Sequence, residues 1–310
     1  MNERPTVNIL LATYNGKKHL KKQLDSLVNQ TYEKIDIYIR DDGSTDGTVE
    51  FIKEYIEKNT SSKNFYIIDS KGVNLRCPGS FYEIARECKP AKYYSFCDQD
   101  DEWYPEKIEW AVERLEQEDA NQVLVYYTAC DYKFVDGTFI RKSPMQSEHL
   151  ELREVLYYTP GSGFTMLFNE AARQKLILEP ELGPELHDRW IIRGGACFGK
   201  VIYEERSTAA HIRHEEAVTA GDSDDKSLIK QFIENELKGD EPVKDRQALV
   251  HFYNCFKDEI TPEQQKLLKL FVDDARSPIT WFKKVCYPKR LRKRLAGEIA
   301  LRMLFFIGKI

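Results

Sequence analysis

Val7-Asn8-Ile9-Leu10-Leu11-Ala12 decides the fold, because this short and nearly continuous apolar run opens an alternation of strand and helix signals. Such a run is typical of a strand that is buried on both faces. Farther along, similar runs predict strands at 35–39, 65–68, 93–97 and 123–130, and apolar stripes at helical spacing lie between them. Repeated β-α-β units of this kind indicate an α/β fold with a mostly parallel sheet and right-handed crossovers.

The pattern changes after about Glu215. Residues 215–226 are acidic and contain Gly, Ser and Thr, which predicts a loop, and only helical patterns follow, at 228–232, 248–256 and 267–271. We therefore expect an α/β domain over residues 1–215 and a helical region over residues 216–310, whose last part, 281–310, is a basic amphipathic tail.

Charge is distributed unevenly along the 310 residues. The formal net charge is −5, but the stretch from Lys283 to the end holds nine Lys/Arg and one acidic residue, so it carries +8 and the remainder carries −13. An acidic body excludes a general nucleic-acid binder, and a basic end suits docking on an anionic surface. No apolar run approaches the roughly 18 residues of a membrane span, so we expect a cytoplasmic protein. The seven cysteines have neither the number nor the spacing of a disulfide framework or a zinc site.

Polar clusters follow three of the predicted strands. Thr13-Tyr14-Asn15 follows the first strand and Asp41-Asp42 follows the second. Ligands of parallel sheets bind beyond the carboxyl ends of the strands. Tyr14 and its neighbours could meet a nucleobase, and a carboxylate of the second cluster could accept the imide N–H of a pyrimidine. The alternative for both clusters is a turn and a helix cap.

The sharpest cluster is Asp98-Gln99-Asp100-Asp101, directly after a hydrophobic strand. Three carboxylates so close together repel one another unless a cation lies among them, although a solvated loop could also tolerate them. Their hard oxygen ligands select Mg²⁺ or Mn²⁺. A divalent ion bridging to a diphosphate would stabilise the negative charge that develops as a sugar–phosphate bond breaks.

Two later clusters contain further candidates. Asp188, in His187-Asp188-Arg189-Trp190, is either a helix cap or a base that takes the proton from an attacking hydroxyl. In His211-Ile212-Arg213-His214, a histidine could bind metal or phosphate and Arg213 could grip phosphate oxygens, or these side chains could be ordinary surface residues.

Taken in order, these motifs resemble the bacterial family 2 glycosyltransferases, which have a GT-A fold. The matching strings are Leu11-Ala12-Thr13-Tyr14-Asn15-Gly16, Arg40-Asp41-Asp42-Gly43-Ser44-Thr45-Asp46 and Cys97-Asp98-Gln99-Asp100-Asp101-Glu102-Trp103-Tyr104-Pro105. The Asp-Gln-Asp-Asp-x-Trp form, together with His-Asp-x-Trp and a late histidine-containing loop that ends in Gly221, is similar to the rhamnosyltransferase branch. The basic tail is similar to that of enzymes in streptococcal rhamnose-polysaccharide pathways.

The resemblance implies an inverting transferase that moves L-rhamnose from dTDP-L-rhamnose onto a lipid-linked saccharide in cell-wall polysaccharide synthesis, with Mn²⁺ or Mg²⁺ as cofactor. It implies that Asp41 contacts the base with Asp42 nearby, that Asp98 meets the ribose or the metal, and that Asp100 binds the metal. Asp188 is the implied catalytic base. We expect the remaining donor contacts from Thr13, Tyr14, Asn15, Gln99 and Arg213, and a metal ligand from His214. Family members often have Tyr-Arg-Gln-His where this chain has His-Ile-Arg-His, so the arginine is shifted by one position.

Other readings stay open. UDP-hexose or UDP-N-acetylhexosamine is the alternative donor, and a non-catalytic nucleotide-binding scaffold is the alternative to an enzyme. A nucleotidyltransferase needs a Gly-rich basic loop for a triphosphate, but residues 13–18 offer one glycine. The tail is either a helix that covers the core or a peripheral anchor at the inner face of the plasma membrane, with Arg290, Arg292, Lys293 and Arg294 on anionic head groups. The sequence leaves a homo-oligomer open.

Overall fold

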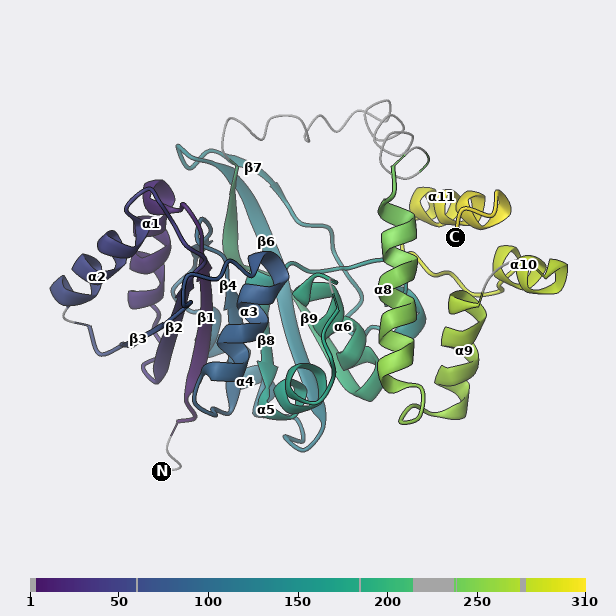
Figure 1. The fold of residues 1–310 in the computed structure, drawn as a ribbon, viewed down its shortest axis with the longest axis horizontal. Helices are drawn as coiled ribbons and strands as arrows, with labels where there is room; N and C mark the ends of the chain where they lie inside the picture. The colour runs from purple at the N-terminus through teal and green to yellow at the C-terminus, as the bar shows by residue number, and fades with distance from the viewer. Residues whose placement is uncertain (1–3, 60, 184, 214–236, 238, 274–276) are drawn as a thin grey trace.

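The structure of the protein, a computed structural model, describes residues 4–59, 61–183, 185–213, 237, 239–273 and 277–310. The predicted boundary between residues 215 and 216, the predicted acidic loop and the helical pattern at 228–232 lie outside these residues. The predicted α/β fold is confirmed: helices flank one sheet with the strand order β3-β2-β1-β4-β8-β6-β9-β5, and β7 pairs with β6 (Figure 1). The strands are β1 Val7–Thr13, β2 Ile35–Asp41, β3 Asn64–Ile68, β4 Tyr93–Cys97, β5 Glu102–Trp103, β6 Val123–Phe134, β7 Phe139–Lys142, β8 Met166–Asn169 and β9 Gly199–Arg213.

The helices of the α/β part follow the predicted alternation, and further helices close the chain. They are α1 Lys17–Val28, α2 Thr48–Lys58, α3 Arg76–Glu87, α4 Lys107–Leu115, α5 Glu170–Arg173, α6 His187–Phe198, α8 Glu241–Phe256, α9 Pro262–Val272, α10 Pro278–Val285 and α11 Leu295–Phe306. The C-terminal helices α8 to α11 lie at the end of the molecule opposite to α2 and β3 (Figure 1).

The first half of the sheet is parallel, as the β-α-β pattern predicts, because β1 pairs in parallel with both β2 and β4. The second half contains strands that the sequence pattern does not predict. The four-residue strand β8 lies antiparallel between β4 and β6. The long strand β9 pairs in parallel with β6, but the pairing shifts near Glu204–Ser207, where a run of charged side chains interrupts the apolar alternation.

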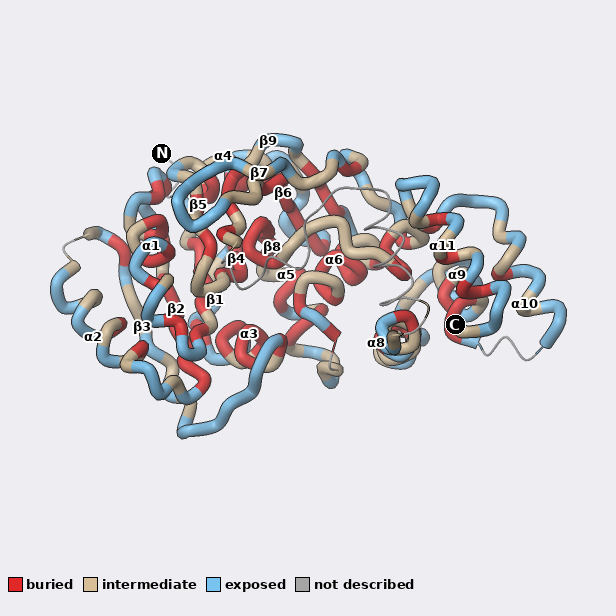
Figure 2. The backbone as a smooth tube through the Cα atoms, turned by 90° about the horizontal axis from the view of Figure 1, so that it is seen from above, coloured by how far each residue is buried: buried red, intermediate tan, exposed pale blue. Residues whose placement is uncertain are grey.

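The core occupies both faces of the sheet. β1 directs Ile9 and Leu11 toward the face covered by α1 and Leu10 toward the opposite face, and all three are fully buried. A strand buried on both faces needs apolar side chains at successive positions, which explains the run that opens the chain. Figure 2 shows the central strands mostly in red, whereas α2 and α10, at opposite ends, are mainly pale blue and tan.

α6 connects the α/β part to the C-terminal helices. The buried Trp190 ring lies 5.3 Å from the ring of Phe252 and 5.7 Å from that of Phe256, both in α8. Next to it, Arg189 forms an ion pair with Asp245 of α8. Two residues of the His-Asp-Arg-Trp motif therefore fix the helical region against the sheet. Among the described helices, none has the length and apolar character needed to cross a bilayer.

Candidate active site

The carboxyl ends of β1, β2 and β4 bring the three predicted polar clusters together. In the parallel register Thr13 lies beside Asp41, and Leu11 lies beside Cys97, so the residues that follow each strand emerge at one edge of the sheet. This is the edge at which ligands of parallel sheets bind.

The carboxylates of Asp41 and Asp42 are already engaged within the protein. Asp41 accepts hydrogen bonds from the hydroxyls of Thr13 (2.8 Å) and Ser44 (2.6 Å) and from the backbone N–H groups of Ser44 (2.7 Å) and Gly43 (3.0 Å). The buried Asp42 pairs with the buried guanidinium of Arg40. These contacts fix the loop after β2, and Asp41 is not among the residues that line the cavity described below.

Gln99 ties the end of β4 to the end of β1. Its side-chain oxygen accepts from the Tyr14 N–H (2.9 Å), and its amide donates to the Tyr14 carbonyl (3.1 Å). Gly16 is required beside it, because a Cβ at that position would overlap the Gln99 amide. Asn15 has a φ of 48° and accepts from the Thr45 N–H (2.8 Å), which joins the loops after β1 and β2. Tyr14 thereby stands rigidly at the rim with half of its surface exposed.

A cavity of about 530 Å³ opens at this rim. Six residues of the predicted donor and metal site line it: Thr13, Tyr14, Asp42, Asp98, Gln99 and Asp100. Ala12 also lines it, as do five residues from the β3–α3 connection and α3 that the sequence does not single out: Asn74, Arg76, Cys77, Ser80 and Phe81. Their only signal is a lone arginine before Cys-Pro-Gly, which is too common a pattern to predict a site.

Asp98 lies in surroundings that disfavour its ionised form, although the charge of His211 acts in the opposite direction. Burial raises its pKa well above the ordinary range, and the charges of Asp101, Asp100 and Asp188 raise it further. The repulsion predicted from the sequence is therefore present at the cavity wall.

Asp101 turns away from this group toward β9. It is 2% exposed, and its Oδ1 lies 2.8 Å from Nδ1 of His211. The hydrogen bond to Asp101 raises the pKa of His211. His211 is thus held beside the aspartates by its contact with Asp101. The predicted metal or phosphate contact of a histidine in this motif stays a prediction. His214 lies outside the described residues.

Asp188 occupies the first turn of α6, where it accepts from the Arg189 N–H (2.7 Å). Burial raises its pKa. It is not a lining residue of the cavity, but its charge raises the pKa of Asp98 and, together with burial and Asp98, that of Cys77 to about 11. Asp188 is therefore within electrostatic range of the acidic wall.

Arg213, at the end of β9, lies with its guanidinium 5.4 Å from the centre of the Tyr132 ring. It is not among the lining residues of the cavity. Its predicted contact with phosphate stays a prediction.

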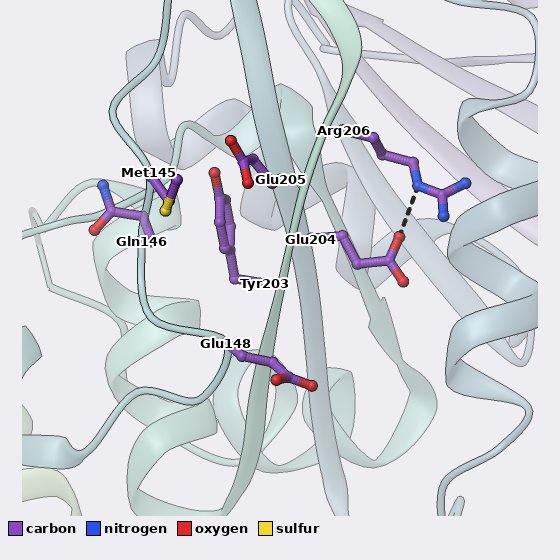
Figure 3. Close-up of a pocket in the computed structure, with 7 residues that line it drawn as sticks. All are labelled: Met145, Gln146, Glu148, Tyr203, Glu204, Glu205 and Arg206. Atoms are coloured by element: carbon purple, nitrogen blue, oxygen red, sulfur yellow. Dashed lines mark ion pairs between the residues drawn. The ribbon is translucent and has the colours of Figure 1, made fainter.

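A second, more open cavity of about 520 Å³ lies beside the irregular part of β9 (Figure 3). Glu204 and Arg206 form an ion pair of 3.0 Å there, and Tyr203 and Glu148 also line it. None of the predicted site residues lines this cavity. We therefore place the candidate active site in the first cavity.

Residues 8–176, more than half of the chain, match the family model described as glycosyl transferase family 2. The chain belongs to glycosyl transferase family 2. The matched residues of this family 2 chain include the loops after β1, β2 and β4 and end before Asp188.

Curated relatives match a smaller part. The dTDP-rhamnosyl transferase RfbG of Shigella flexneri is 33% identical over 132 residues, which are 41% of this family 2 chain and 45% of that protein. An uncharacterized glycosyltransferase of Rickettsia prowazekii is 33% identical over 132 residues, 43% of this chain and 38% of that protein. The chain thus spans less than half the length of these relatives.

Solved structures match nearly the whole chain. S. aureus TarS 1-349 in complex with UDP has a TM-score of 0.53 and 15% identity, covering 98% of this chain and 91% of that one. Mannosyltransferase PcManGT from Pyrobaculum calidifontis, in complex with GDP-Man and Mn²⁺, has a TM-score of 0.52 and 14% identity, covering 100% and 89%. At these identities the likeness concerns the fold, which is the GT-A fold that the family 2 motifs predict.

The acidic wall of this family 2 protein offers ligands for a divalent ion but no complete cage. Among the described residues, no group of three or more His, Cys, Asp or Glu side chains is arranged to hold a metal ion. Mg²⁺ sites commonly consist of one or two carboxylates completed by substrate phosphates. The carboxylate oxygens of Asp98 and Asp100 at the cavity wall, and the neighbouring carboxylates that raise the pKa of Asp98, fit such a site.

Proposed function

We propose that this protein is an inverting glycosyltransferase that moves a sugar from a nucleoside-diphosphate donor to an acceptor hydroxyl. The observation that carries the proposal is the acidic cavity at the carboxyl ends of β1, β2 and β4, in a chain of glycosyl transferase family 2. A non-catalytic scaffold would gain nothing from keeping Asp98 at a raised pKa, because clustered buried charge costs stability.

The donor that we propose is dTDP-L-rhamnose. The likeness to RfbG and the order of the motifs support this choice. Tyr14 is exposed at the rim, where its ring can stack on a base, and Asp41 and Asp42 hold the neighbouring loop in place. Thr13, Asn15 and Gln99 fix the loops that shape the donor site, and Arg213 is the proposed phosphate contact. UDP-hexose or UDP-N-acetylhexosamine remains the alternative donor.

Asp98 and Asp100, with His214, are the proposed ligands of Mn²⁺ or Mg²⁺. When bound, the ion would neutralise the charge that develops on the departing diphosphate. The remaining task of the protein is to hold the sugar and the acceptor in line. His211, held by Asp101, acts on the acidic group by lowering the pKa of Asp98.

Asp188 is the proposed base. It would take the proton from the acceptor hydroxyl while the acceptor oxygen forms a bond to the anomeric carbon and the carbon–diphosphate bond breaks, with inversion at that carbon. Its raised pKa suits the role, because a more basic carboxylate accepts a proton more readily. One carboxylate is sufficient, in contrast to the pair that a hydrolase needs around a water molecule.

We further propose a lipid-linked saccharide in cell-wall polysaccharide synthesis as the acceptor, and a position at the inner face of the plasma membrane. Residues 1–215 would bind the donor, and residues 216–310 would form a helical region that ends in the membrane-facing tail. The basic charge of that tail supports the location.

A thermal-shift panel tests the donor. The protein is heated with Mn²⁺ and, in turn, dTDP-L-rhamnose, UDP-glucose, UDP-N-acetylglucosamine and GDP-mannose, and each donor that binds is then tested for release of its nucleoside diphosphate. We expect the largest shift and the fastest release with dTDP-L-rhamnose. A larger shift with a UDP-sugar would replace the proposed donor, and no shift with any of them would contradict the transferase.

A further inference from the structure

We propose that α10 and α11 form a platform that docks on an anionic lipid bilayer. The platform face consists of seven large apolar side chains that are between 47% and 66% exposed: Ile279, Phe282, Leu295, Ile299, Met303, Phe306 and Ile307. Single exposed apolar residues need no explanation, but a group of them on two adjacent helices marks an interaction surface.

The spacing within α11 shows that this exposure is built into the helix. Leu295, Ile299 and Met303 recur every four residues, so they lie on one side of the helix. Leu301, Leu304 and Phe305 are buried against the body of the protein. The helix is therefore apolar on two sides, and the part of the chain that the structure describes covers only one of them. Of the apolar tail residues, Leu304 and Phe305 serve the core, whereas Leu295, Ile299 and Phe306 belong to the platform face.

Contacts between the two helices hold the face in one piece. The Trp281 indole donates to the Phe306 carbonyl (3.0 Å), and the two rings lie 5.5 Å apart. The buried Glu298 accepts from the N–H groups of Leu291 and Arg292 (2.8 Å each), which fixes the connection between α10 and α11. A surface that is ordered before binding loses little entropy when it docks.

The charge around the face selects an anionic partner. Lys283, Lys289, Arg290, Lys293 and Arg294 are exposed, whereas the single acidic side chain of residues 277–310, Glu298, is buried. An apolar face with a cationic rim matches acyl chains below anionic head groups. α11 lies in the upper part of Figure 1, the side toward which β1 runs. Ala12, Thr13 and Tyr14, at the end of β1 and after it, line the acidic cavity. The inference deepens the proposed function, on which it rests for the lipid-linked acceptor.

Vesicle flotation tests the platform with the full chain. Wild-type protein is mixed with phosphatidylcholine vesicles that contain phosphatidylglycerol, and the Phe282→Ser/Ile299→Ser double variant is compared with it. We expect the double variant to partition roughly tenfold less or weaker still, since two large apolar side chains lose their burial. The matched control is Val135→Ser/Phe139→Ser, which changes two exposed apolar residues outside the platform and should float like the wild type. Circular dichroism and thermal unfolding confirm that each variant is folded.

Charge is tested separately. Lys283→Gln/Arg294→Gln should lower binding to phosphatidylglycerol vesicles by roughly tenfold or more and leave the weaker binding to pure phosphatidylcholine unchanged. The platform is refuted if the wild type does not float, or if the Phe282→Ser/Ile299→Ser variant floats as well as the wild type. It is equally refuted if the wild type is a dimer without vesicle affinity and that variant is a monomer, because the face would then bind a second copy.

Donor turnover in solution separates this inference from the proposed function. Release of nucleoside diphosphate from the sugar donor depends on the cavity and not on the platform, so all platform variants should retain it. Normal flotation without any turnover would contradict the proposed transferase and support the platform. Turnover without flotation would support the transferase and contradict the platform.

Discussion

Two strand ends of this protein carry adjacent aspartates, and they differ in what surrounds the charge. After β2, Asp41 accepts four hydrogen bonds and Asp42 pairs with Arg40, so both carboxylates are compensated by their own loop and strand. After β4, Asp98 faces two neighbouring carboxylates and Asp188, and its pKa is raised. Aspartates at corresponding strand ends therefore lie in different electrostatic surroundings, one set engaged by its own loop and strand and the other set among like charges.

The contrast gives a criterion for assigning aspartates at such a rim. A carboxylate that its own loop satisfies stabilises the fold as it stands, whereas one that repels its neighbours stabilises only a state that contains a cation. On this criterion we propose that the β2 end shapes the donor site and that the β4 end, together with Asp188, takes part in the reaction.

The largest effect is expected from Asp188→Asn. The amide cannot accept the proton of the acceptor, so kcat should fall by roughly 10²–10⁴-fold, while the affinity for the donor changes little. Transfer assays and isothermal titration with the donor measure the two quantities, and Asp119→Asn, in an exposed turn, is the control. Normal turnover in Asp188→Asn would show that Asp188 is not the base.

Asp42→Asn tests the compensated end. It removes the ion-pair partner of the buried Arg40 guanidinium, and breaking a buried ion pair costs about 3–5 kcal/mol of unfolding free energy. Urea unfolding measures this loss. A loss close to zero would show that the β2 end does not depend on the pair and would weaken the contrast between the two ends.

Asp98→Asn should raise the unfolding free energy, whereas Asp42→Asn should lower it. Removing a charge whose pKa burial and neighbouring carboxylates raise should stabilise the protein without metal, with a rise in Tm on the order of 2–4 °C if about 1 kcal/mol is recovered. The same variant should lose the stabilisation that Mn²⁺ gives to the wild type. A lower Tm without metal would mean that Asp98 is compensated after all.

A further effect, on the pH dependence of stability, concerns His187, whose neutral ring is packed between Phe81 and Phe96. Burial lowers its pKa from the ordinary 6.5 to about 3, so below pH 6.5 the unfolded chain binds the proton and the folded protein does not. The contribution of neutral His187 to the unfolding free energy is complete above pH 6.5. It is lost as the pH falls toward 3, at up to about 1.4 kcal/mol per pH unit.

The raised pKa of Asp98 has the opposite effect on the pH dependence of stability, because at Asp98 the folded state takes up the proton first as the pH falls. The difference in unfolding free energy between the wild type and His187→Gln therefore isolates the histidine. It should shrink between pH 7 and pH 5, and a constant difference would contradict the buried neutral ring.

Much of the fold can be predicted from the sequence, because strands that are buried on both faces appear in it as apolar runs. β8 and β9 were beyond this reasoning: β8 has four residues, and the charged residues Glu204, Glu205 and Arg206 interrupt β9 where its pairing shifts. Their antiparallel and parallel pairings depend on partners far along the chain, which local pattern does not specify.

The rim of the site was predictable for the same reason, since strand ends of a parallel sheet converge. The different surroundings of the individual aspartates could not be predicted from the sequence. The sequence does not distinguish Asp101, whose carboxylate contacts His211, from Asp98. It also does not show that Arg40 forms an ion pair with Asp42. Long-range contacts also decide that Arg76 and Cys77 reach the cavity.

The central claim is that the acidic β4 end binds a divalent cation together with the diphosphate of the donor. Isothermal titration of dTDP into the wild type and into Asp100→Ala, each with Mn²⁺ and with a chelator, tests it most directly. We predict that Mn²⁺ strengthens binding to the wild type at least roughly tenfold, which corresponds to about 1.4 kcal/mol, and has no effect on Asp100→Ala. Equal strengthening by Mn²⁺ in both proteins would contradict the account.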